Sequence, residues 1–335
     1  MNLNSKNLTT IELPVLTVLV ISFVTVAFLE IIHREQLYNT QLIMGSFDVI
    51  ERIPPWQVNQ NRLMGPAILK LMTLIGFSKW WAVRIFALFF VVFSNFLYVK
   101  ALSIMSNSKY LILNSLLIFN GLFIISQDKW IYVWDLIDIS FYIFYALLIF
   151  EKKYVKYLFT INFLHIFNRE SFLIMSLFFI ILIIIENKLN IVQSLKNKII
   201  KGLIFNIFFG TTYIYFSRKI LFLGNSPLIG DNVDQGSSFL EGQWITPLLN
   251  FYMLTSGEEV VTNLLIVITI FSVIGYILLN FRVFNRSEKY IGFAILLNVV
   301  PVFIFGVIFE TRQFFASIVL FSFLIFSRNK NSLHS

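Results

Sequence analysis

The sequence FNRES at residues 167–171 places an arginine beside a glutamate between two apolar runs, residues 154–166 and 172–185. An ionisable side chain at the centre of a bilayer costs at least about 2.5 to 3.5 kcal/mol, so such side chains usually line a water-filled cavity, pair with other charges or bind a substrate. The simpler alternative is a turn at the membrane surface, with Asn168 as helix N-cap and Glu170 in the first turn. A turn alone leaves the arginine unexplained.

Other acids and arginines stand at the ends of apolar runs. Asp135 and Asp138 lie three residues apart, on one face of a helix, although the helix dipole also favours acids near a helix start. Arginine binds phosphate through two parallel donors, and a carboxylate can act as a general base. The pattern suits a substrate that carries a phosphate or pyrophosphate and a hydroxyl to be activated. The candidate general bases are Asp48 and Glu51, with Glu30 as a further alternative, and the candidate substrate-binding residues are Arg62, Arg84, Asp135, Asn168, Arg169, Glu170, Glu310 and Arg312.

The composition places these residues in a membrane protein. Of 335 residues, 58% are hydrophobic and 13% are charged, and the mean hydropathy is +0.80, which excludes a soluble globular domain. Several apolar runs approach or exceed the roughly 20 residues that a spanning helix needs, whereas barrel strands would alternate over about ten. We predict an all-α, polytopic helical bundle of about ten membrane segments, forming a single integral membrane domain over residues 1–335. The clearest runs are residues 13–32, 81–102, 130–150, 260–281 and 290–309.

The chain has no cysteine and three scattered histidines, so we expect no disulfide, no thiolate metal site and no histidine metal cluster. We interpret residues 13–32 as a retained first span. Two long polar connections, residues 33–65 and 217–259, interrupt the apolar runs. A shorter apolar piece of about eleven residues, 67–77, is predicted to be interfacial or re-entrant.

The basic residues predict the orientation, because cytoplasmic loops collect lysine and arginine. With both termini inside, 15 basic and four acidic residues fall on the cytoplasmic side, so that side carries +11, the outer side carries −3, and together they give the net charge of +8. The two long connections and the candidate site residues then face outward. This topology explains the basic charge without a nucleic acid.

The order of these features resembles bacterial multi-span glycosyltransferases of the GT-C superfamily. The matching features are an acid in the first outer loop, an Arg-Leu-x-x-Pro entry to the next helix, an Asp at the head of a later span, Asn-Arg-Glu-Ser/Thr, and Glu-x-Arg. In this chain they are Asp48, RLMGP at 62–66, Asp135, NRES at 168–171 and ETR at 310–312. The resemblance extends over nearly the whole chain, although each motif is short.

The GT-C resemblance implies a polyprenyl-phosphate sugar donor outside the membrane and a first-loop carboxylate as base. The chain departs from the pattern because it lacks a paired acid in that loop and a C-terminal soluble domain, which leaves the base open among Asp48, Glu51 and Glu30. The chain also resembles Wzy-type O-antigen and capsule polymerases in its size, its two large outer loops and its outward arginines.

We therefore expect glycosyl transfer in surface-polysaccharide assembly at the periplasmic face of a bacterial inner membrane, with transferase and polymerase both open. The alternative is a transporter or flippase of lipid-linked saccharides, for which charges at mid-membrane and discontinuous helices would be the mark. A structural subunit would leave the outer charges unexplained. The expected partners are a polyprenyl-linked sugar or oligosaccharide and the bilayer, and not nucleic acid. No cofactor is expected, a divalent cation is left open, and the oligomeric state is not predicted.

Overall fold

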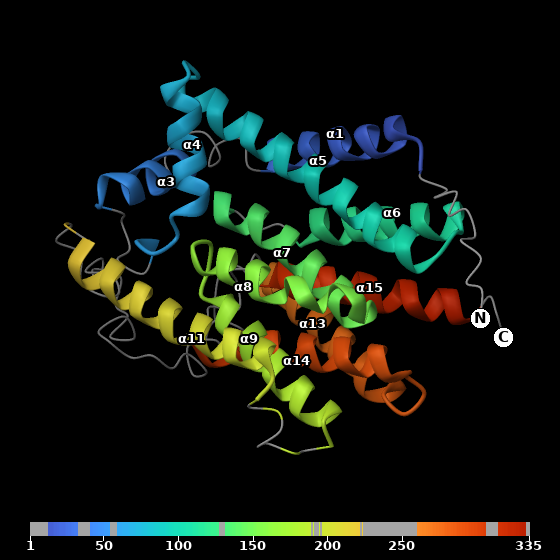
Figure 1. Ribbon diagram of the computed structural model, residues 1–335. Helices are drawn as coiled ribbons and strands as arrows, with labels where there is room; N and C mark the ends of the chain where they lie inside the picture. Colours follow the sequence, from blue (N-terminus) through green and yellow to red (C-terminus); the bar gives the residue numbers. More distant parts are fainter. Residues whose placement is uncertain are drawn as a thin grey trace, which may run out of the picture.

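The fold was analysed in a computed structural model that describes residues 13–32, 41–53, 59–126, 131–188, 190, 194, 196–221, 223, 260–305 and 314–332. Within these ranges the chain forms twelve α-helices, one 3-10 helix and one π-helix, and it has no strand (Figure 1). The predicted all-α class is therefore confirmed.

In the described part of the chain, four helices are long and apolar enough to cross a membrane: α1 (Val15–Ile32), α5 (Lys79–Met105), α7 (Val133–Phe150), and α11 (Lys198–Phe216) together with the π-helix η3 (Ser217–Leu221). Shorter apolar helices are α4 (Met64–Leu74), α6 (Lys109–Ile125) and α9 (Ser171–Glu186). The remaining α-helices are α3 (Gln41–Glu51), α8 (Leu158–Ile166), α13 (Val260–Asn280), α14 (Arg286–Phe305) and α15 (Phe315–Ser332). These lengths and compositions are those of a membrane protein, while the count of about ten segments remains a prediction.

The predicted connections are helical in part. The first outer connection, expected to be a polar loop over residues 33–65, contains helix α3. The apolar piece at 67–77 corresponds to α4, which ends at a left-handed glycine, Gly76, with φ of 106°. The central motif separates α8 from α9, as expected from the two short apolar runs around it.

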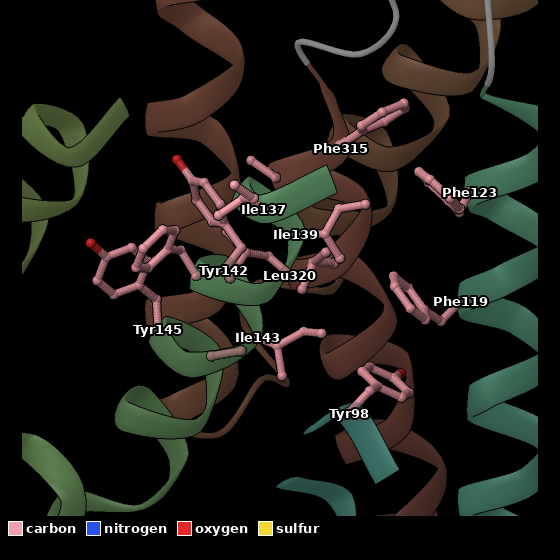
Figure 2. Close-up of a cluster of buried hydrophobic side chains, with 14 of the residues drawn as sticks. Tyr98, Phe119, Phe123, Ile137, Ile139, Tyr142, Ile143, Tyr145, Phe315 and Leu320 are labelled. Carbon is pink, nitrogen blue, oxygen red and sulfur yellow. The ribbon is translucent and has the colours of Figure 1, made fainter. Parts of the chain in front are cut away.

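Helix α7 is the central element of the bundle. It packs against α5, α15, α4, α8 and α14, and nearly all of its side chains are buried. Toward α6 and α15 these side chains are apolar, and Figure 2 shows Ile139 among the aromatic rings of Phe119, Phe123 and Phe315. The hydroxyl groups of Tyr142 and Tyr145 point away from α6 (Figure 2). Helix α7 therefore offers an apolar side to one half of the bundle and polar groups to the other.

A buried polar contact joins the helices on the apolar side of α7. Asn120 of α6 accepts hydrogen bonds from Thr25 of α1 at 2.8 Å and from Asn95 of α5 at 3.1 Å, and it returns one to Asn95 at 2.9 Å. In lipid, such interhelical bonds contribute about 0.6 kcal/mol each, and helices associate mainly through close packing. These contacts hold α1, α5 and α6 together beside the central helix.

The basic connections share one end of the bundle. There, Glu186 at the end of α9 pairs with Lys152 at 2.7 Å and with Arg286 at 3.6 Å, and Lys330 donates to the Met105 carbonyl. The 3-10 helix η2 (Lys152–Tyr157) and the ends of α5, α9, α14 and α15 meet in these contacts. They are the connections predicted to be cytoplasmic; which side of the membrane they face remains a prediction.

Candidate functional site

A cluster of one carboxylate and two guanidinium groups lies at the opposite end of the bundle. Glu170, in the turn before α9, pairs with Arg62 at 3.3 Å and with Arg218 of η3. The side chains are 12% exposed for Arg62, 14% for Arg218 and 26% for Glu170. We call these three residues the arginine cluster. Two of them were predicted site residues, and the third, Arg218, comes from the start of the second long connection.

Close packing of α4 brings Arg62 to this turn. The backbone N–H of Met64 donates to the Phe167 carbonyl at 2.9 Å, so the start of α4 caps the end of α8. One residue later, a Cβ atom on Gly65 would lie 2.6 Å from the side chain of Val133, so only glycine permits this approach of α4 to α7. The RLMGP sequence thus has a structural reason for its glycine.

Arg218 is positioned from the other side by α11 and η3. Its Nε donates to the Asn61 side chain at 3.0 Å, and the Tyr213 hydroxyl donates to the Asn61 carbonyl at 2.9 Å. Arg218 also stands on a π-helix, Ser217–Leu221. Such single turns within α-helices are rare and occur frequently at functional sites.

The two guanidinium groups keep Glu170 ionised. Burial alone would raise its pKa, but Arg62 and Arg218 outweigh that effect and lower the pKa from 4.5 to about 2. At neutral pH the cluster therefore has two positive charges and one negative charge, and Glu170 is too weakly basic to take a proton from a substrate hydroxyl.

Arg169 points to different partners from those of its neighbour Glu170. Its Nη1 lies 3.0 Å from an oxygen of Asp135 and 3.7 Å from one of Asp138, so the two acids of α7 face the same guanidinium group. Asp135 also accepts the Tyr132 backbone N–H at 2.8 Å, which stabilises the start of α7. Arg169 and Glu170, although adjacent in the chain, therefore belong to two separate clusters.

Asn168 is not the N-cap of α9, contrary to the turn interpretation. Glu170 occupies that position, and its side chain makes no capping bond. The Asn168 amide instead donates to the Trp134 carbonyl at 3.0 Å and to Asp138 at 3.4 Å. Asn168 is fully buried, and it anchors the turn to α7 instead of starting a helix.

A polar network extends from Asp138 into the core. His165 Nε2 lies 2.5 Å from Asp138 and 3.1 Å from the Ser171 hydroxyl, while its Nδ1 lies 3.0 Å from the Tyr145 hydroxyl. In a serine–histidine–aspartate triad the serine and the carboxylate contact opposite ring nitrogens, whereas here both contact Nε2. The geometry therefore does not support nucleophilic catalysis by Ser171. The sequence interpretation missed His165, because its partners come from other parts of the chain.

The remaining predicted residues lie elsewhere. Arg84 of α5 forms a separate pair with Glu30 of α1 at 2.9 Å and stacks on Trp80, beside a largely apolar cleft between α1, α5 and α7. Asp48 and Glu51 are on α3, and within the described residues the structure gives neither a direct contact with the arginine cluster. Glu310 and Arg312 lie outside the described residues.

Asp48 differs from the other acids of this end. It is half-buried, and burial together with the nearby Glu51 raises its pKa, although Lys79 partly opposes the shift. Glu51 is exposed. The raised pKa makes Asp48 a stronger base than an ordinary aspartate.

Two buried donors beside Arg62 have no hydrogen-bond partner within the described part of the chain. They are the Asn61 side-chain amide and the Trp134 indole N–H, and the Arg62 guanidinium lies 5.2 Å from the Trp134 ring centre. A buried donor left unpaired costs about 1 to 3 kcal/mol, so each such group calls for an explanation. Among the described residues, no group of three or more acids and histidines could hold a metal ion.

No known family, curated protein or solved structure matches the chain. The resemblance drawn from the sequence therefore depends on the motifs themselves. Of the five motifs, the structure brings three together: RLMGP at 62–66, Asp135 and NRES at 168–171. Arg62 contacts Glu170, and Asp135 contacts Arg169.

Proposed function

We propose that this protein transfers a sugar from a polyprenyl-(pyro)phosphate donor to an acceptor hydroxyl, at the extracytoplasmic face of a bacterial inner membrane, in surface-polysaccharide assembly. The transfer is that of a GT-C-like transferase or a Wzy-type polymerase. One observation carries the proposal: Arg62 and Arg218 converge on the Glu170 carboxylate beside the buried donors of Asn61 and Trp134.

This arrangement suits a phosphate group. Two guanidinium groups meet at the Glu170 carboxylate, and their side chains are only 12% and 14% exposed, so the place is poorly solvated. Phosphate oxygens accept two parallel bonds from a guanidinium and further bonds from amide or indole N–H groups. A phosphate bound there would satisfy the donors that the described residues leave unpaired.

The same contacts would favour the reaction. In the transfer, the bond from the anomeric carbon to the phosphate oxygen breaks, and a bond to the acceptor oxygen forms. The departing phosphate gains negative charge, which fixed arginine groups stabilise more strongly in the transition state than in the bound donor. The acceptor hydroxyl gives its proton to a base, for which Asp48 is the proposed residue because Glu170, Asp135 and Asp138 are already bound by arginine.

Lipid binding and sugar transfer test separate parts of this proposal. Protein in nanodiscs should bind polyprenyl phosphate more tightly than polyprenol, and Arg218→Gln should remove that difference. Arg282→Gln, at an exposed arginine of the basic end, is the matched control. Equal binding of phosphate and alcohol by the wild-type protein would refute the assignment of the arginine cluster.

Transfer is measured with a labelled polyprenyl-phosphate sugar and membrane acceptors. Asp48→Asn should abolish transfer while it leaves donor binding intact, because an amide cannot take the acceptor proton. Glu51→Gln is the control and should retain transfer. If Asp48→Asn transfers normally, the base lies elsewhere, and Glu51 or Glu30 takes its place.

A second function has one specific observation in its favour. The chain breaks between α8 and α9, and a buried polar network runs from that break through His165, Tyr145 and Asn162. Broken helices with polar groups at depth are typical of transporters. Proteoliposomes that move a fluorescent lipid-linked saccharide between leaflets, with no transfer in the assay above, would favour a flippase.

A further inference from the structure

A polar cavity lies at the basic end of the bundle, opposite the arginine cluster. It has a volume of about 350 Å³ and lies among the ends of α5, α7, α14 and α15. Its polar lining comes from Glu151, Asn285, Arg286, Ser327, Lys330 and Asn331. Pockets for small ligands begin at about 300 Å³, so the cavity is large enough for a lipid headgroup.

A buried carboxylate organises the wall of this cavity. Glu288 is fully buried and accepts hydrogen bonds from the Ser327 hydroxyl at 2.8 Å, the Asn331 amide at 2.9 Å and the Asn285 backbone N–H at 2.8 Å. These bonds fix the start of α14 against the end of α15. The lining residues are therefore held in place before any ligand binds.

The charges that line the cavity are mainly positive. The lining contains two cations, Arg286 and Lys330, and one carboxylate, Glu151. Glu151 lies 3.9 Å from Lys153, which is not part of the lining. Arg286 lies 3.6 Å from Glu186 and donates to the Tyr290 hydroxyl at 2.6 Å, so it is held at the rim. Lys330 donates to the Met105 carbonyl at the end of α5.

We propose that this cavity binds the headgroup of an anionic phospholipid, with the phosphate between Arg286 and Lys330. Basic pockets between membrane helices bind anionic headgroups, and each nearby Lys or Arg contributes to the affinity. The hydroxyl and amide groups of Ser327 and Asn331 suit the polar part of a glycerol headgroup. The cavity lies at the other end of the bundle from the arginine cluster. The lipid-binding proposal therefore does not depend on the proposed function.

Native mass spectrometry of the full chain tests the proposal with phosphatidylglycerol and phosphatidylcholine. Retention of phosphatidylglycerol should exceed that of phosphatidylcholine, and Arg286→Gln and Lys330→Gln should each weaken it about fivefold. Glu151→Gln should strengthen it, because one negative charge leaves the lining. Lys188→Gln and Arg282→Gln remove exposed cations outside the lining and should change little.

Two results would overturn the proposal. The first is equal weakening by the control variants, which would show a diffuse charge effect. The second is displacement of the lipid by glycerol phosphate or inorganic phosphate at similar concentration, which would assign the cavity to a soluble anion. Thermal midpoints of all variants establish that they remain folded, and the gain expected from Glu151→Gln does not depend on a loss of folding.

Discussion

Replacement of Glu170 should destabilise the protein more than replacement of either of its arginine partners. Glu170→Gln leaves two guanidinium groups, 12% and 14% exposed, facing each other without a carboxylate between them. Arg62→Gln or Arg218→Gln instead leaves one intact ion pair. Because Glu170→Gln removes both of these ion pairs and each arginine variant removes only one, the three variants should differ in this order.

The pKa of Glu170 gives the size of the stability loss expected from Glu170→Gln. The shift from 4.5 to about 2 corresponds to about 3 kcal/mol of net stabilisation of the charged form in the folded protein. Since the folded-state pKa is the lower one, this stabilisation is present above pH 4.5 and is lost as the pH falls toward 2. Breaking a buried pair costs about 3 to 5 kcal/mol, which agrees with this magnitude.

The assay is thermal or denaturant unfolding in nanodiscs between pH 7 and pH 3. The matched control is Glu186→Gln, because Glu186 also pairs with two cations, but its partners Lys152 and Arg286 are 66% and 60% exposed. Exposed pairs contribute about 0 to 1 kcal/mol, so this control should remain close to the wild type. The reasoning is refuted if both glutamine variants lose the same stability at pH 7, or if wild type and Glu170→Gln lose stability in parallel on acidification.

Three further predictions concern packing, orientation and the second charge cluster. Gly65→Ala should lower stability by about 1 to 3 kcal/mol through overpacking, whereas Gly121→Ala, with open space at its Cβ, should be neutral or stabilising in the same unfolding assay. Cysteine at the exposed Ile53 should react with an impermeant maleimide in intact spheroplasts, and cysteine at the exposed Lys188 only after lysis; the reverse pattern would invert the topology. Arg169→Gln removes the guanidinium that the buried carboxylates of Asp135 and Asp138 share and should accumulate poorly, and wild-type accumulation would contradict the ion pairs described here.

The helices could be predicted from the sequence because the length and polarity of an apolar run are local properties. The break at residues 167–170 and the short helix α4 were predicted in the same way. The partners of each charge could not be predicted, because they depend on how distant helices cross. Arg62 and Glu170 are 108 residues apart, and Arg169 and Glu170, adjacent in the chain, belong to different clusters. Both acids of α7 were singled out, while His165 was set aside as an isolated histidine.

The four residues of the central turn explain how the break between α8 and α9 is held. The Phe167 carbonyl accepts a bond from α4, Asn168 donates to α7, Arg169 pairs with α7, and Glu170 pairs with Arg62 and Arg218. Non-helical backbone in an apolar bundle needs partners from protein or water, and here the protein supplies partners to each of the four residues. Because successive residues are held by different segments, the turn is fixed on several sides. This arrangement holds Glu170 and its two arginine partners in place, as the anion site proposed above requires.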